Sequence, residues 1–157
     1  MLVSAMLAAC SSAPLTNPED ESPACASAAN IASLSEVIGH NPNDAQAYNM
    51  RGTVLGRARR HEEALADFNK ALRLDANYAE AYANRALVYR QTGKIDLAVA
   101  DYNRALTSRG LAYERLGDKE KAAGSYGKAL NIDKKSEAAR AGFSRVGGQY
   151  GRSYQTF

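Results

Sequence analysis

Apolar and small residues recur along the chain at the spacing of an α-helix that buries one face. Tyr48, Gly52 and Leu55 stand at i, i+4 and i+7, which places them on one side of a helix. The segment that follows repeats this spacing with Ala64, Phe68 and Ala71. Because a small residue opposite a bulky one lets two helices approach closely, the pattern predicts pairs of tightly packed helices.

The same pair of helices recurs 34 residues further along the chain. The aligned positions are Tyr48 and Tyr82, Arg51 and Arg85, Gly52 and Ala86, Leu55 and Tyr89, Ala64 and Ala98, Asp67 and Asp101, Phe68 and Tyr102, and Asn69 and Asn103. The period and the order of aromatic and small positions resemble the tetratricopeptide repeat (TPR) over roughly residues 26–146. This resemblance implies an all-α fold, a solenoid of helix-turn-helix units.

A third copy of the pattern follows after only 24 residues, so we expect a shortened third repeat. The aligned positions are Ala86 and Gly110, Tyr89 and Tyr113, Gly93 and Gly117, Ala98 and Ala122, and Tyr102 and Tyr126. The ten missing residues belong just after Leu106, where a turn and half a helix are expected. One alternative is a continuous helix from about Ile95 to Leu116, which directs the third unit elsewhere, including onto a second chain. The other is a tight break at Thr107-Ser108 that leaves a stunted helix.

Helix boundaries and composition divide the chain into segments. A lone second helix of a preceding unit comes first, and the alignment places three of its residues at inward positions: Asn30, Leu34 and Val37. Asp44 is a predicted N-cap, and Gly93 and Gly117 are expected to end helices in the left-handed conformation. The predicted segments are a signal peptide at 1–9, a flexible tether at 10–25, a half repeat at 26–42, repeats at 45–78, 79–108 and 109–132, a C-terminal capping helix at 135–146 and a flexible tail at 147–157.

Composition supports helices and separates two electrostatic regions. Alanine accounts for 30 of the 157 residues, and there are nine tyrosines against three phenylalanines and no tryptophan. Alanine loses no side-chain entropy in a helix and covers little of a strand's surface. Residues 1–50 carry five acidic groups and no Lys or Arg, whereas residues 51–157 carry 20 basic and 12 acidic groups. Because the basic side chains are scattered and form no stripe, we expect no nucleic-acid partner.

The first ten residues have the character of a targeting segment. Residues 1–9 are uncharged, and Leu7-Ala8-Ala9-Cys10 resembles the lipobox of bacterial lipoproteins. The resemblance implies lipidation of Cys10, attachment to the membrane through that lipid and, with Ser11 next, an outer-membrane location facing the periplasm. A basic region before the apolar run is missing. Either the true start lies further upstream or Cys10 stands by chance in an alanine-rich terminus.

The repeated charges favour a structural role over a catalytic one. Arg51 and Arg85 are expected to pair with Asp67 and Asp101, which recur at the same phase of the second helix. In the third unit the aspartate position holds Ser125, so Arg109 is expected to lack a carboxylate partner. The sequence contains no arrangement typical of a nucleophile, a phosphate loop or a metal site. We therefore expect no enzyme activity, no cofactor and no metal.

By the TPR resemblance, ligands bind in a concave groove lined by the first helix of each unit. The implied groove residues are Asn49, Met50, Thr53, Arg57, Asn84, Leu87, Arg90, Gln91, Leu111 and Arg115. Amides can hydrogen-bond a peptide backbone, and guanidinium groups can bind carboxylates. Of the residues of the family's carboxylate clamp, only Asn84 is matched.

Together these features predict a scaffold or adaptor at the bacterial cell envelope that binds a peptide or protein partner in the groove. Two alternatives stay open. In the first, the chain is a structural protein that forms a homodimer through the shortened third repeat. In the second, the ten-residue loss is damaging, and the chain is a truncated family member with impaired function, since fewer than three units are close to the stability limit of a stacked array.

Overall fold

The computed structural model describes residues 23–148, with side chains from Ser27 onward. This part of the chain contains seven α-helices and no strand: α1 (Pro23–His40), α2 (Ala45–Arg57), α3 (His61–Leu74), α4 (Ala79–Gln91), α5 (Ile95–Arg115), α6 (Lys119–Ile132) and α7 (Glu137–Arg145). The predicted signal peptide, Cys10 and residues 149–157 of the predicted tail lie outside the described residues. The boundaries of the predicted segments stay predictions.

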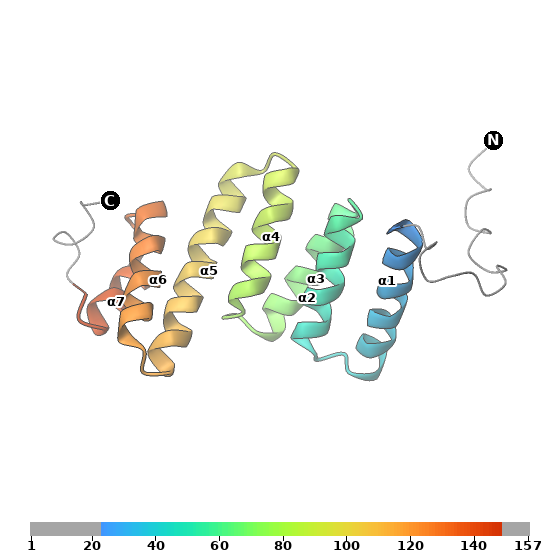
Figure 1. Ribbon diagram of the computed structural model, residues 1–157. Coiled ribbons are helices and arrows are strands. Elements are labelled where there is room, and N and C mark those ends of the chain that lie inside the picture. Colours follow the sequence, from blue (N-terminus) through green and yellow to red (C-terminus); the bar gives the residue numbers. More distant parts are fainter. Residues whose placement is uncertain (1–22, 149–157) are drawn as a thin grey trace.

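The helices form a row in which each packs against the next, from α1 to α7 (Figure 1). Helices α1 to α5 run alternately up and down, and α2 also contacts α4, so the first helices of two successive repeats lie side by side. The predicted all-α TPR solenoid is confirmed. Asp44 caps α2 by accepting a hydrogen bond from the Ala47 amide at 3.0 Å. Gly93 and Gly117 adopt φ values of 75° and 79°, as their positions predict.

The pairing of small and bulky residues determines how closely the helices approach. Phe68 is buried against Gly52, where an added Cβ would come within 2.9 Å of the Phe68 ring. In the third unit Tyr126 takes the same place, and a Cβ on Gly110 would lie 2.7 Å from its ring. Both glycines are required because their helices pack directly over an aromatic ring.

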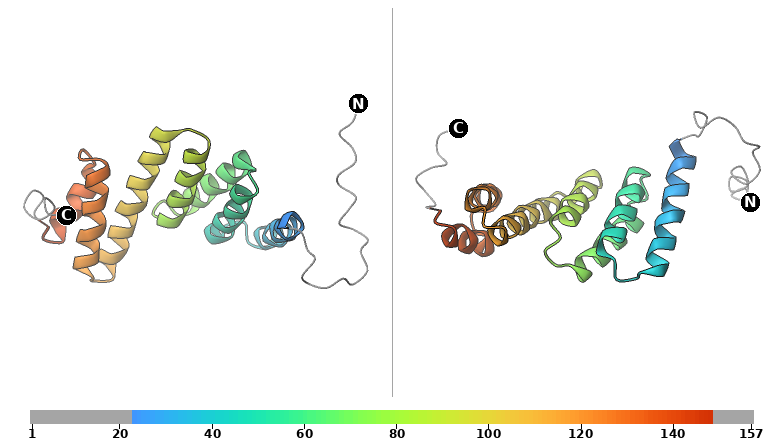
Figure 2. Two further views of the ribbon diagram at one scale, coloured as in Figure 1. Left: turned by 45° about the horizontal axis from the view of Figure 1, so that its top comes forward. Right: turned by 60° about the horizontal axis from the view of Figure 1, so that its bottom comes forward.

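Helix α5 is continuous over 21 residues, so the structure takes the first of the two alternatives for the shortened repeat (Figure 2). Its first half packs against α4 as the second helix of one repeat, and its second half packs against α6 as the first helix of the next. No glycine or proline interrupts it until Gly110, which is buried in the helix. As a result, the α5–α6 loop lies on the opposite side of the row of helices from the α2–α3 and α4–α5 loops, at the bottom in Figure 1.

The repeat pattern predicts the buried residues of α7 correctly but those of α1 only in part. Helix α7 covers α6 with Ala139 and Phe143, as expected of a capping helix. In α1 the alignment is wrong about two of the three inward positions, because Asn30 and Val37 are exposed and Ile38 is buried instead. The face that carries Asn30 and Val37 would pack on a first helix of the same unit. None precedes α1 within the described residues, so only the face toward α2 is covered.

Candidate functional site

Two hollows adjoin along the face formed by α2 and α4. The first, of about 140 Å³, lies between these helices and is lined by Gly52, Thr53, Gly56, Arg57, Phe68, Asn84, Leu87, Val88 and Gln91. The second, of about 470 Å³, extends from α2 to α1 and is lined by Asn30, Ser33, Leu34, Asn49, Met50, Thr53, Val54 and Glu80. Thr53 lines both hollows, so they adjoin at this residue, and together they are named the groove. Seven of the ten predicted groove residues line it: Asn49, Met50, Thr53, Arg57, Asn84, Leu87 and Gln91.

The other three predicted groove residues lie elsewhere. Leu111 lines a separate hollow of about 240 Å³ between α5 and α7, and Arg115 is exposed at the end of α5. Arg90 is exposed in the last turn of α4, outside both groove hollows. Leu111 and Arg115 are separated from the groove because the second half of α5 continues away from α4. Whether any of the ten residues contacts a ligand stays a prediction.

Hydrogen bonds between side chains form the floor of the groove. Asn49 is only 2% exposed and donates from Nδ2 to the Tyr78 hydroxyl at 3.2 Å. Asn84 Nδ2 donates to Asn49 Oδ1 at 3.1 Å and to Thr53 Oγ1 at 3.2 Å. Burial raises the pKa of the Tyr78 hydroxyl above its ordinary value. Asn49 therefore joins α2 to the start of α4, while the amide oxygen of Asn84 accepts no hydrogen bond from the described residues.

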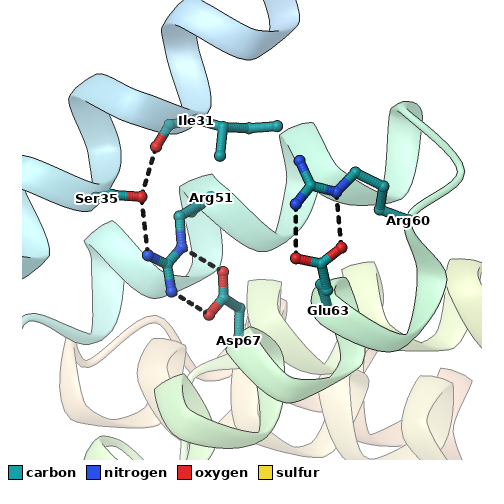
Figure 3. Close-up of polar contacts among 6 residues, drawn as sticks. All are labelled: Ile31, Ser35, Arg51, Arg60, Glu63 and Asp67. Atoms are coloured by element: carbon teal, nitrogen blue, oxygen red, sulfur yellow. Dashed lines mark hydrogen bonds and ion pairs between the residues drawn. The ribbon is translucent and has the colours of Figure 1, made fainter. Parts of the chain in front are cut away.

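A buried ion pair supports each of the first two repeats from behind the groove. Arg51 donates to both oxygens of Asp67 at 2.8 Å and to Ser35 Oγ of α1 at 3.0 Å (Figure 3). Arg85 donates to both oxygens of Asp101 at 2.7 Å. These hydrogen bonds raise the pKa of both arginines. The predicted structural pairs are confirmed, and both aspartates are buried.

In the third unit an arginine stands at the equivalent position, but a serine replaces the aspartate. Arg109 Nε donates to Ser125 Oγ at 3.3 Å, at the same separation of 16 residues as in the two ion pairs. Arg109 has no carboxylate partner among residues 27–148, as predicted. The sequence position of the pair is thus preserved even though α5 has lost its turn.

A different network, which the sequence pattern does not indicate, holds the last three helices together. Glu114 of α5 accepts a hydrogen bond from the Tyr126 hydroxyl at 2.7 Å and two from Arg145 of α7 at 2.8 and 3.0 Å. Arg145 and then Tyr126 lower the pKa of Glu114 to about 2. Burial, followed by the Glu114 contact, raises the pKa of Tyr126 to about 12. The partners are 12 and 31 residues from Glu114, beyond the reach of any helical spacing rule.

An apolar stripe on α5 is left partly uncovered. Ile95, Val99, Tyr102 and Leu106 follow the i, i+4, i+7, i+11 spacing of one helix face, and Ile95 and Val99 are 54% and 43% exposed. A fourth hollow, of about 420 Å³, borders the stripe and is lined by Ala79, Glu80, Ala83, Tyr102, Ala105, Leu106, Arg109 and Ile132. It lies beside α4, where the missing half-helix of the third repeat would pack.

Two other features are absent from residues 23–148. No group of three or more His, Cys, Asp or Glu side chains is placed to hold a metal ion. None of the seven helices is long and apolar enough to cross a membrane.

Comparison with family models finds repeats over half the length of the solenoid. Residues 60–93 match the model described as TPR repeat, and residues 79–108 and 104–136 match models described as tetratricopeptide repeat. The last two matches overlap at residues 104–108, in the middle of α5. The overlap agrees with the continuous α5, which belongs to two neighbouring repeats in the structure.

Individual proteins resemble parts of the chain. DnaJ homolog subfamily C member 7 from Mus musculus is 38% identical over 68 residues, which cover 41% of this chain and 14% of that protein. The chain thus spans about one seventh of the length of the curated relatives that it matches. The crystal structure of MamA is 30% identical and covers 67% of each chain with a TM-score of 0.45. That of YrrB, described as a TPR protein with an unusual peptide-binding site, is 23% identical, covers 73% of this chain and 64% of its own, and has a TM-score of 0.47.

Proposed function

Because the chain belongs to the tetratricopeptide repeat proteins, we propose that it is a non-enzymatic scaffold that binds a peptide or protein partner in the groove of α2 and α4. The observation that carries the proposal is the joining of the two groove hollows at Thr53. Their combined length runs from α1 to the end of α4, which suits an extended segment better than a compact small molecule.

The lining of the groove defines the kind of segment it would bind. Met50 and Leu87 are exposed apolar side chains within the groove, at 49% and 39%, and offer contacts to apolar residues of a ligand. The amide oxygen of Asn84 accepts no hydrogen bond from residues 27–148, so it is available to a backbone N–H of a ligand. Arg57 lines the same hollow and forms no ion pair among the described residues, so it is available to a carboxylate.

The test is selection of peptides from a random display library on the full chain, followed by calorimetry of the selected peptides. Leu87→Asp and Asn84→Ala are expected to weaken binding tenfold or more, by about 1.4 kcal/mol or above. Leu97→Asp is the matched control, because Leu97 is also an exposed leucine, at 50% against 39% for Leu87, but lies on α5 outside the groove. Equal affinity of the wild type and both groove variants would remove the groove from the function.

The location of the scaffold is a further part of the proposal. The lipobox-like Leu7-Ala8-Ala9-Cys10 supports lipid attachment at Cys10 and an outer-membrane position facing the periplasm. Expression of the full chain in a Gram-negative bacterium and mass spectrometry of the purified N-terminus test this. A lipidated Cys10 is expected in the wild type and no lipid in Cys10→Ser. An unmodified Cys10 or an intact Met1 in the wild type contradicts the proposal.

A second candidate function is self-association as a homodimer, favoured by the uncovered stripe on α5. Two copies of the stripe could cover each other, since Ile95 and Val99 leave apolar surface exposed beside the hollow that borders α4. Light scattering of the full chain carrying Cys10→Ser distinguishes the candidates. A concentration-dependent dimer that Val99→Asp abolishes, and Val37→Asp does not, supports self-association. A monomer at high concentration excludes it and leaves the groove proposal untouched.

A further inference from the structure

One arginine occupies a backbone conformation that the chain elsewhere gives to glycine. Arg59, in the loop between α2 and α3, has φ of 60° and lies 34 residues before Gly93. Gly93, Gly117 and Gly147 take the same place in later loops, with φ of 75°, 79° and 83°. The hydrogen bonds also match, because the Arg59 amide donates to the Gly56 carbonyl at 3.1 Å as the Gly93 amide donates to that of Arg90 at 3.2 Å.

No side-chain contact of Arg59 with residues 27–148 offsets the strain of this left-handed conformation. In the left-handed region the Cβ of an L-residue crowds a neighbouring carbonyl oxygen, and glycine avoids that strain. The Arg59 side chain is exposed and forms no hydrogen bond or ion pair with residues 27–148. A strained residue that the fold does not need points to a role in binding something outside the fold.

Other cations lie at the same end of the molecule. Because α1 to α5 are successively antiparallel, the α2–α3 loop and the α4–α5 loop lie at the end where α1 begins (Figure 1). These loops and the helix turns next to them carry Arg57, Arg59, Arg90 and Lys94, none of which forms an ion pair with another described residue, and Arg60, which pairs with Glu63. Glu62 and Asp96 lie in the same turns, so the basic residues outnumber the acidic ones by five to three.

The opposite end of these helices has the reverse character. The α1–α2 loop, residues 41–44, and the α3–α4 loop, residues 75–78, contain Asp44 and Asp75 and no Lys or Arg. With the adjoining helix turns included, this end carries Arg73 against Asp44, Asp75 and Glu80. The solenoid from α1 to α5 is therefore polarised along its helices in net charge, with an excess of two basic residues at one end and of two acidic residues at the other.

We propose that the end carrying Arg57, Arg59, Arg90 and Lys94 binds the surface of an anionic phospholipid bilayer. This inference rests on the proposed lipid attachment at Cys10. Only 12 residues separate Cys10 from Pro23, where α1 begins, so a lipid at Cys10 keeps this end within about 45 Å of the membrane. A cluster of four or more basic side chains near a bilayer attracts anionic lipids, at roughly a fivefold gain in binding for each. The chain connection and the basic excess of the two loops would both direct this end to the membrane, against the opposing charge of Glu19, Asp20 and Glu21 in the connecting segment.

The main experiment measures the contact without the lipid anchor. Full-length chain carrying Cys10→Ser is sedimented with vesicles of phosphatidylcholine mixed with phosphatidylglycerol, and with vesicles of phosphatidylcholine alone. Binding is expected only to the mixed vesicles and is expected to fall as salt is added. Arg59→Glu combined with Lys94→Glu is expected to reduce it by about tenfold or more. The control pair Arg73→Glu and Lys128→Glu changes the net charge equally at exposed positions of α3 and α6, outside these loops and turns, and is expected to retain binding.

A single glycine substitution separates binding from folding. Arg59→Gly relieves the strain and is expected to raise the melting temperature by about 2 to 8 °C, while lowering vesicle binding about fivefold. A variant that folds better and binds worse cannot be explained by a structural role of Arg59.

Several outcomes overturn the inference. They are absence of binding to the mixed vesicles, equal loss in the control pair, unchanged binding of Arg59→Gly, and binding to soluble polyphosphate without binding to vesicles. Since vesicle binding is measured on the unlipidated chain, it can fail while Cys10 is lipidated, and it can succeed while the groove binds no peptide. The result therefore distinguishes this inference from the proposed function.

Discussion

The first repeat and the region around α5 follow the same sequence pattern but bury it differently. In the first repeat, α4 lies over α3, and Phe68 is only 1% exposed. At the aligned position of the second repeat, Tyr102 is half-buried beside a hollow of about 420 Å³. The residues that pack within each helix pair are equivalent in both regions. What differs is whether the chain turns back to cover the outer face of the pair.

Packing within a repeat and contact with the next repeat therefore depend on different features of the sequence. Small-to-bulky pairing and the arginine hydrogen bond to the residue 16 positions later connect residues within one helix pair, and both survive the loss of ten residues. Coverage of the outer face depends on a turn that brings the next helix alongside. With that turn absent, α5 extends straight on for about 31 Å, and the third unit packs against its far half.

The largest expected effect comes from restoring the missing turn. Inserting a copy of residues 75–84 after Ser108 returns the third repeat to a spacing of 34 residues. We expect α5 to divide into two antiparallel helices, Val99 and Tyr102 to become buried, and any homodimer to dissociate. A structure of the variant, light scattering and thermal unfolding check this.

The insertion also tests the idea that the ten-residue loss is damaging. A broad, non-cooperative melt of the wild type that the insertion converts into a sharp one supports damage. A cooperative wild-type melt contradicts it. An inserted chain that keeps a continuous α5 would show that the turn is not what separates the two regions.

Replacing the aligned aromatic residues Phe68 and Tyr102 with alanine measures how differently the two rings are buried. Phe68→Ala is expected to reduce the free energy of unfolding by about 3 to 5 kcal/mol, because it leaves a cavity against Gly52. Tyr102→Ala is expected to cost about half as much or less, since its ring already borders an open hollow. Urea unfolding of both variants gives the ratio. Equal losses would mean that the stripe on α5 is covered in solution.

Acid should loosen the C-terminal helices through Glu114. Its folded pKa of about 2 lies below the ordinary value of 4.5, so its stabilising contribution is present above pH 4.5 and is lost as the pH falls toward 2. The melting temperature of the wild type is expected to approach that of Glu114→Gln over this interval. A constant difference between the two proteins down to pH 2 would contradict the role of the Arg145 and Tyr126 bonds.

The smallest expected effect comes from returning the missing carboxylate to the third unit. Ser125→Asp places an acidic group at the position of Asp67 and Asp101, facing Arg109. We expect a gain of only about 0.5 to 1 kcal/mol, because Arg109 is exposed and water screens the pair. Urea unfolding of Ser125→Asp and of Ser125→Asp with Arg109→Gln measures the coupling. A loss of stability in the first variant would mean that Arg109 is not held as its equivalents are.

Sequence reasoning reached the repeats, the caps and the Arg–Asp pairs because each depends on a fixed local spacing. It was wrong about Asn30 and Val37, which the alignment places inward but which have no helix to pack against. It also did not single out Arg59, whose left-handed conformation is signalled only by alignment with Gly93.

For the candidate site, the sequence alone determined which helix faces could contribute side chains, since a helical period assigns every residue to a face. Only the tertiary structure decided which faces meet. It joined the residues of α2 and α4 in one groove, buried Asn49 beneath Asn84, and carried Leu111 and Arg115 away on α5. The physical reason is that a missing turn changes the direction of everything after it without altering the pattern of any single helix.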